Sequence, residues 1–243
     1  QRELEPQAAG VPAVRERDPY DAFQQATKDD LVLPVRKLVQ GVSRKADTTK
    51  AGQFWDEISD SYKPQMDVAI IWMKRERSMF PDDTLDSGPL CASNDAVKPR
   101  EQVNVRGEAT GPTCEVCAFS QWESAKDGRG QACQFSYGLL CYDLDDSEMF
   151  VLRVSGASRG DWKRYITRGQ RQGTAAYAII TTIGSEQRKY PKGSAFAITF
   201  QAGTPLPEDT AEFMREKVME YQQVALTEAQ PEPEPEFDAT PFE

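Results

Sequence analysis

The chain has 243 residues, enough for one large domain or two small ones, and its 39% hydrophobic and 28% charged residues are typical of a globular protein. No apolar run approaches the roughly 18 residues of a membrane-spanning helix, and no signal-peptide pattern is present, so we expect a cytoplasmic protein. The chain contains no histidine, which excludes Ser-His and Cys-His nucleophile pairs. We therefore expect that it is not an enzyme.

The charge is distributed unevenly along the chain. The net charge is −10, which by itself argues against a nucleic-acid partner. Residues 151–200, however, carry nine basic and two acidic side chains, whereas residues 201–243 carry two basic and eleven acidic ones. This segregation predicts a basic surface and an acidic tail with separate roles.

The first half of the chain predicts an arm followed by strands. Residues 1–30 are polar and lack an apolar period, so we expect a flexible N-terminal arm. A strand is expected within residues 31–41, interrupted by Pro34. Residues 66–80 predict a long strand that leaves a buried stretch and turns basic.

The second half predicts two hairpins and two helices. One hairpin flanks the acidic turn at 143–148, and another joins the β-rich runs 174–190 and 193–203. A short helix is expected at 160–173, with Asp161 as its N-cap, and a C-terminal helix at 207–226. The Pro-Glu sequence 227–243 predicts a disordered acidic tail.

The expected fold is mainly β with short helices. Five or six strands, an inserted cysteine loop and a terminal helix suggest an OB-type barrel over residues 31–226, with a zinc-ribbon insertion at about 88–135.

Four of the five cysteines lie in this polar insertion. Their spacing is Cys91-x22-Cys114-x2-Cys117-x15-Cys133, and the loop has too few apolar residues for a core of its own. A tetrahedral zinc thiolate centre would hold such a loop, with no open position for catalysis. A redox CxxC pair or two inert buried thiols are the alternatives; the redox motif usually opens a helix after a strand, and here a loop precedes it. Cys141, in an apolar run, is expected to be an ordinary buried residue.

Several segments together resemble the zinc-containing single-stranded DNA-binding proteins of bacteriophages and prophages. These segments occur in one order over residues 31–220: LPVRKLVQGVS, AGQFWD, CASNDAVKP, CEVC, GQAC, DWKRYITR and AAYAIITTI. The resemblance implies an OB-type barrel with an inserted zinc ribbon and one structural zinc on Cys91, Cys114, Cys117 and Cys133. It also implies non-sequence-specific single-stranded DNA binding in phage-type replication or recombination, in the host cell cytoplasm if the protein is phage-encoded.

Basic and aromatic residues alternate on the same expected elements, as a single-strand interface requires. The candidate DNA contacts are Lys74, Arg75, Arg77, Trp162, Lys163, Arg164, Tyr165, Arg168, Tyr177, Arg188, Lys189 and Lys192. Trp72 and Phe196 accompany them. The alternative is that the aromatic side chains, Trp162 and Tyr177 above all, pack in the core while the charges form a solvated face.

The end of the chain resembles the acidic linker and Pro-Phe tip of bacterial single-stranded DNA-binding proteins. The residues of this tip are Phe237, Asp238, Pro241 and Phe242. The resemblance implies that the tail recruits replication or recombination enzymes; the alternative is a purely solubilising segment.

Two other functions are compatible with the sequence. A zinc-ribbon transcription or adaptor factor would bind duplex DNA or protein, although the expected helix at 160–173 is short for a recognition helix. A metal-dependent nuclease would need a carboxylate cluster, for which Asp145, Asp146 and Glu148 are the nearest candidates.

Overall fold

The computed structural model describes residues 32–41, 51–81, 88–126, 128, 130–190 and 193–228, with backbone only for 223–228. Its strands are β1 (Val35–Leu38), β2 (Phe54–Asp56), β3 (Tyr62–Lys63), β4 (Met66–Met79), β5 (Cys91–Ser93), β6 (Asn104–Val105), β7 (Glu108–Ala109), β8 (Gln134–Asp143), β9 (Glu148–Ser155), β10 (Ile179–Tyr190) and β11 (Gly193–Pro205). Its helices are α1 (Ser158–Arg171) and α2 (Glu208–Glu228), with short 3-10 turns η3 (Ala118–Ser120) and η4 (Ala176–Ala178). The expectation of a mainly β protein with short helices is confirmed.

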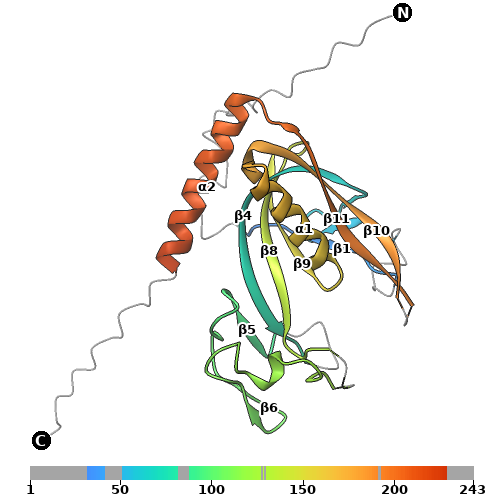
Figure 1. Cartoon of the computed structure of the whole chain (residues 1–243), viewed down its shortest axis with the longest axis vertical. Helices are drawn as coiled ribbons and strands as arrows, with labels where there is room; N and C mark the ends of the chain where they lie inside the picture. Colours follow the sequence, from blue (N-terminus) through green and yellow to red (C-terminus); the bar gives the residue numbers. More distant parts are fainter. Residues whose placement is uncertain are drawn as a thin grey trace, which may run out of the picture.

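Nine of the described strands form one curled sheet, a half-barrel (Figure 1). The order is β11-β10-β4-β8-β9-β1-β2-β3, with β5 on the free side of β4. Neighbouring strands are antiparallel except for β1 and β9, which are parallel. Antiparallel hairpins of this kind need only short connections, which agrees with the predicted turns.

Hydrogen bonds link β11, at one end of the sheet, to the connection between β1 and β2. The Gln40 side-chain amide donates to the Phe196 carbonyl at 3.0 Å, and the Phe196 N–H donates to the Gln40 Oε1 at 2.9 Å. Gly52, which has a φ of +93°, packs against the Phe196 ring. A Cβ at residue 52 would lie 2.6 Å from that ring. The approach therefore requires glycine. These contacts join the β10–β11 hairpin to the segment that connects β1 and β2.

Each face of the sheet buries its own apolar cluster. The inner face packs under α1 in a cluster that includes Phe150, Leu152 and Trp162. The outer face packs under α2 around Leu140, Tyr142 and Met214. Both helices are thus held by apolar burial on one side, as amphipathic helices on a sheet generally are.

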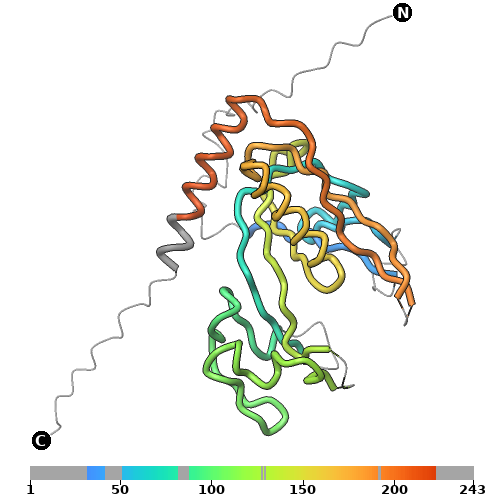
Figure 2. The backbone as a smooth tube through the Cα atoms, in the orientation of Figure 1, coloured from blue at the N-terminus to red at the C-terminus, as the bar shows by residue number. Residues whose placement is uncertain are grey.

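Strand β4 changes character along its length, as predicted for residues 66–80. Its first half is buried on both faces, and a bulge between Ile70 and Trp72 resets the alternation of its side chains. Its second half, from Lys74, forms an arm with β8 that carries the cysteine module, residues 88–133 (Figure 2). A third, smaller cluster lies in that module, around Met79, Cys117 and Phe119.

A buried arginine ties the start of the sheet to the β8–β9 turn. Arg36 is 3% exposed and pairs with four carboxylates: Asp56, Asp143, Asp146 and Glu148. Lys63 adds a second cation, 2.8 Å from Asp143. Burial alone would raise the pKa of Asp143, but hydrogen bonds from Lys63 and Arg36 outweigh it and lower that pKa below its ordinary value.

The expected elements are present, with three corrections. Both hairpins form where predicted, but more strands are present than the expected five or six, because two- and three-residue strands are too short to show alternation. Helix α1 begins at Ser158 rather than at an Asp161 cap, and its N-cap residue Ala157 makes no side-chain cap bond. Helix α2 runs to Glu228, just past the predicted boundary.

The expected arm 1–30 and the tail beyond Glu228 lie outside the described residues. Within the part of the chain that is described, no helix combines the length and apolarity needed to cross a membrane.

Candidate nucleic-acid interface

Helix α1 presents its basic residues on one side because its apolar residues face the sheet. Lys163, Arg164, Arg168 and Arg171 are exposed. Trp162 and Tyr165, one or two positions away, are buried beneath them. The helix therefore offers a cationic ridge in which neighbouring charges are fixed relative to each other.

Trp162 and Tyr165 themselves lie in the core, not at the surface. They are 2% and 8% exposed, and their rings stack with centroids 5.7 Å apart. The Trp162 indole N–H donates to the Met73 sulfur at 3.3 Å, and the Tyr165 hydroxyl bonds Thr181. Burial raises the pKa of Tyr165. This burial supports the alternative that the two aromatic side chains pack in the core.

A groove of about 480 Å³ opens beside this helix. We call it the α1–α2 groove, because it runs between the C-terminal part of α1, the edge of β4, η4 and α2. Among its lining residues are Trp72, Tyr177, Arg168, Gln170, Gln172 and Gln222. Trp72 and Tyr177 are half-buried, so each keeps part of its ring accessible.

The groove exists because β4 lacks a neighbour there. Strand β10 pairs with β4 only over Met66–Val68, and β5 only over Arg77–Met79. Between these ladders, no described strand covers that edge of β4. The groove thus combines apolar walls, two partly accessible aromatic rings, side-chain amides and one guanidinium.

The predicted cations of β4 do not share one groove. Lys74 and Arg75 alternate to opposite faces, and Lys74 pairs with Glu76 at 2.9 Å. Arg77 donates to the Cys133 carbonyl at 3.3 Å and lies over the Phe135 ring. Arg77 therefore connects the strand to the cysteine module, and only Arg75 and Lys74 are exposed.

The hairpin cation Arg188 is held by acidic residues. It bonds both carboxylate oxygens of Asp161 on α1, at 2.6 and 3.2 Å, and Glu186 at 3.0 Å. The bonds to Asp161 and Glu186 raise the pKa of Arg188. The hydrogen bond from Arg188 is the largest cause of the lowered pKa of Asp161. Lys189 is exposed nearby, and Lys192 lies outside the described residues.

The four predicted zinc thiols converge within the cysteine module. Cys114, Cys117 and Cys133 are buried, Cys91 is half-buried, and all are free thiols. Burial raises the pKa of Cys133 to about 11, and the other three thiols add to the shift. Gly111 packs so closely that a Cβ there would lie 2.9 Å from the Cys117 Cα.

The module does not show the expected zinc ribbon. No group of three or more cysteine, aspartate, glutamate or histidine side chains within the described ranges has the arrangement of a metal site. Cys91, Cys114 and Cys117 all contribute to the raised pKa of Cys133, so the four thiols lie near one another. Cys141 is fully buried in the sheet core, as expected for an ordinary strand residue.

The carboxylates considered for a nuclease are occupied with structural partners. Asp146 and Glu148 pair with Arg36, and Asp146 also lies 2.6 Å from Lys63. Asp145 is exposed in the β8–β9 turn. Asp146 and Glu148 therefore serve as counter-charges for the buried Arg36.

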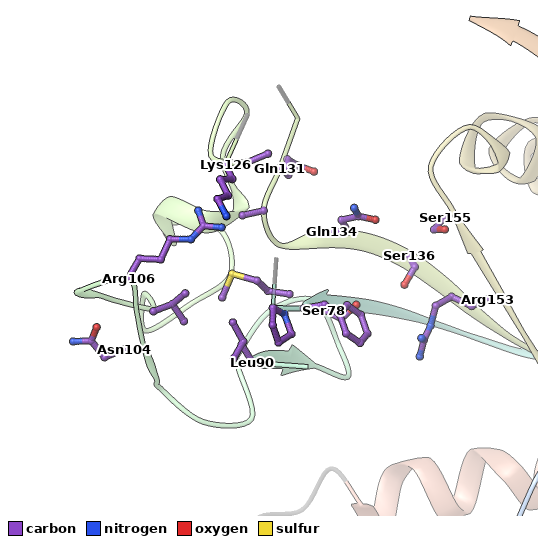
Figure 3. Close-up of a pocket in the computed structure, with 16 residues that line it drawn as sticks. Ser78, Leu90, Asn104, Arg106, Lys126, Gln131, Gln134, Ser136, Arg153 and Ser155 are labelled. Carbon is purple, nitrogen blue, oxygen red and sulfur yellow. The ribbon is translucent and has the colours of Figure 1, made fainter. Parts of the chain in front are cut away.

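Two surface features were not predicted from the sequence. Trp122 is 73% exposed and shares a surface hollow with Arg106; a tryptophan in a polar loop was the available signal. The second is a larger cavity between the module and the sheet, lined by distant residues that include Arg106, Lys126 and Arg153 (Figure 3). No spacing rule could bring these positions together.

The predicted tail residues Phe237, Asp238, Pro241 and Phe242 lie outside the described residues. No protein-family model matches this chain, and no curated protein or solved structure matches it either.

Proposed function

We propose that this protein binds single-stranded DNA without sequence preference, through the α1–α2 groove and the cationic ridge of α1. The observation that carries the proposal is the placement of two partly accessible aromatic rings, Trp72 and Tyr177, in one groove with Arg168. Stacking on aromatic rings tolerates every base and contributes about 1–3 kcal/mol per base. Cations beside such rings neutralise the strand's phosphates.

The half-barrel supports an OB-type reading of the fold. Its curl and the bridge from Gln40 to Phe196 are compatible with a small barrel that is only partly closed. OB-type barrels bind extended strands across one face and use loops to complete the site. In the proposed role the protein coats exposed strands during replication or recombination, and its acidic tail recruits partner enzymes.

We further propose that one structural zinc per chain is bound by Cys91, Cys114, Cys117 and Cys133. In support, Cys117 and Cys133 lie in the small apolar cluster of the module with Cys91 packed against it, and Cys114 is close enough to contribute to the raised pKa of Cys133. A bound zinc would replace missing apolar burial as the source of local stability. The four thiolates would saturate the metal and leave no position for chemistry.

The test is a fluorescence titration with poly-dT, duplex DNA and RNA at two salt concentrations. Tyr177→Leu and Trp72→Leu keep apolar bulk in the groove while removing the ring, and each should weaken poly-dT binding by about 1–3 kcal/mol. Arg168→Gln should reduce the salt slope by about 0.7. Arg215→Gln on the exposed side of α2 is the matched control and should change neither property.

Two outcomes would overturn the proposal. Equal affinity for duplex and single strand would favour the transcription-factor alternative. If poly-dT binding is insensitive to all three groove substitutions, the groove is not the DNA site. The result would instead favour an adaptor protein in which the groove binds an apolar peptide along the free edge of β4.

A further inference from the structure

The turn that follows η3 in the cysteine module holds a tryptophan in the solvent. Trp122 is 73% exposed, although the turn around it is fixed by hydrogen bonds. The Gln121 side-chain amide donates to the Glu115 carbonyl at 2.7 Å, and the Ser124 hydroxyl donates to the Phe119 carbonyl at 2.8 Å. Phe119 itself is buried in the small core of the module. The exposed position of Trp122 is therefore built into an ordered turn.

Trp122 differs from the other three tryptophans of the chain. Trp162 is buried, Trp72 is half-buried, and the indole N–H of Trp55 donates to Asp60 at 2.6 Å. The Trp122 side chain makes no hydrogen bond and no ring contact with any residue that the structure describes. A rigid ring loses little conformational entropy when it is immobilised, so an exposed tryptophan on an ordered turn is typical of a binding surface.

The Trp122 ring borders a surface hollow of about 340 Å³. The rest of the lining combines apolar and hydroxyl groups with one cation and two carboxylates: Ala118, Phe119, Ser124, Arg106, Glu108 and Glu123. Arg106 already takes part in another interaction, and the carboxylates repel a phosphate. A flat neutral ring suits this position, because it stacks through its π face and needs no counter-charge.

The β4–β8 arm connects this turn to the α1–α2 groove. Trp72 lines the groove where the arm begins, and Met79 at the far end of β4 belongs to the core of the module. Figure 2 shows the two strands running side by side between these places. The stretch from Trp72 to Met79 spans roughly 23 Å at about 3.3 Å per residue. Arg75 lies within it, is exposed, and forms no ion pair with any described residue.

We propose that Trp122 stacks on a nucleobase of the bound single strand, as a third aromatic contact after Trp72 and Tyr177. The strand then runs from the α1–α2 groove along the β4–β8 arm, where Arg75 neutralises a phosphate between the aromatic contacts. This inference rests on the proposed single-strand binding and extends its footprint to the cysteine module. The arm holds the two ends of the interface at a fixed separation.

Oligonucleotide length tests this footprint. Oligo-dT of about 4 nucleotides occupies the groove alone, and oligo-dT of about 16 nucleotides also reaches the module; these lengths are the limits of OB-type site sizes. Trp122→Leu should weaken binding of the long oligonucleotide by about 5–150-fold, the equivalent of about 1–3 kcal/mol for one stacked base. It should leave the short one unaffected.

Two further variants separate stacking from apolar bulk. Trp122→Phe keeps a ring and should retain most of the affinity for the long oligonucleotide. Val97→Ala alters another exposed apolar residue of the module, outside the hollow, and should change neither affinity. An unchanged melting temperature of Trp122→Leu shows that the substitution leaves the fold intact.

Fluorescence gives a second readout that does not depend on affinity. Trp122 is the most exposed of the four tryptophans, so acrylamide should quench its emission most strongly. Saturating long oligo-dT should protect this emission, and the short oligonucleotide should not. The protection should be absent from Trp122→Phe.

The outcomes separate this inference from the proposed function. If Tyr177→Leu weakens binding of both oligonucleotides while Trp122→Leu binds the long one like the wild type, only this inference is overturned, and the exposed ring is left for a protein partner. Equal weakening of both lengths in Trp122→Leu also overturns it, because the short strand does not reach the module. If the wild type binds neither length, the proposed strand binding itself fails.

Discussion

The sheet and the cysteine module of this chain are stabilised in different ways. The inner core of the sheet contains 14 buried residues, whereas the cluster in the module has five, two of them cysteines. At about 25 cal/mol per Å² of buried apolar surface, the sheet has ample driving force and the module has little. A long polar insertion with so few buried apolar residues is the part of the chain in which a cross-link or a metal would add most stability.

Breaking the module should produce the largest effect. Cys117→Ser should abolish zinc binding and remove hydrogen-exchange protection from the Cys114 and Cys133 amides, which bond Val97 and Phe119. Structural zinc contributes about 10–16 kcal/mol of binding free energy in small domains, so the module should unfold locally while the sheet remains folded. Metal analysis and amide exchange measure both.

The control for this experiment lies in the sheet. Cys141→Ser should keep about one zinc per chain and instead lower the stability of the sheet, where Cys141 is fully buried. Wild-type protein without zinc, or unchanged protection in Cys117→Ser, would contradict the zinc proposal.

Breaking the sheet core is expected to cost less than losing the proposed zinc but to act globally. Trp162→Ala removes a buried ring that contacts Tyr165 and Phe200 and should cost about 3–5 kcal/mol in urea unfolding. Trp122→Ala removes the same side chain from an exposed site in the module and should stay within about 0.5 kcal/mol. Equal costs for the two substitutions would refute the burial contrast between the two regions.

The charged cluster around Arg36 makes the sheet sensitive to acid. The folded-state pKa values of Asp56 and Asp143 are lowered, so their contribution to stability is present above the unfolded pKa near 3.9 and is lost as pH falls through the folded values. Asp143→Asn leaves Arg36 and Lys63 short of a counter-charge and should cost roughly 3 kcal/mol at pH 7.

The pH dependence provides the check. Stability of the wild type should decline below about pH 4, and this decline should be shallower in Asp143→Asn. Parallel acid-unfolding curves for the two proteins would show that Asp143 does not contribute to the pH dependence of stability.

The sequence predicted the long elements well because their patterns are local. The apolar-to-basic change along residues 66–80 and the two hairpins reappear in the structure because alternation and turn residues act within a few positions. The start of α1 was misplaced because Asp161 resembles a cap, whereas in the structure its carboxylate serves Arg188 and Arg164.

The sites were harder to predict because burial decides them. Trp162 and Trp122 are both tryptophans among polar residues, yet one is in the core and the other is exposed. Likewise, Arg106, Lys126 and Arg153 line one cavity only because the β4–β8 arm places the module beside the start of β8 and the end of β9. Neither fact follows from spacing along the chain.

The smallest expected effect concerns Arg188, which was predicted from the sequence as a DNA contact. Its guanidinium must leave Asp161 before it can reach a phosphate, so its contribution to affinity is reduced by the ion pair it gives up. Arg188→Gln should therefore cost only about 0.2–1 kcal/mol of stability, as expected of a partly exposed pair. It should leave the salt slope of poly-dT binding unchanged, in contrast to Arg168→Gln.

Asp161→Asn sharpens this contrast between the hairpin and the α1–α2 groove. The substitution keeps the shape of the side chain but releases Arg188, so a strand that passes the hairpin would bind more tightly to this variant. If the strand follows α1 instead, poly-dT affinity should be unchanged while Arg168→Gln still weakens it. A decrease of about 0.7 in the salt slope for Arg188→Gln would place a phosphate at the hairpin, because one lost single-strand contact changes the slope by that amount. The groove and the hairpin would then form one continuous interface, with Asp161 as a competitor that the strand displaces.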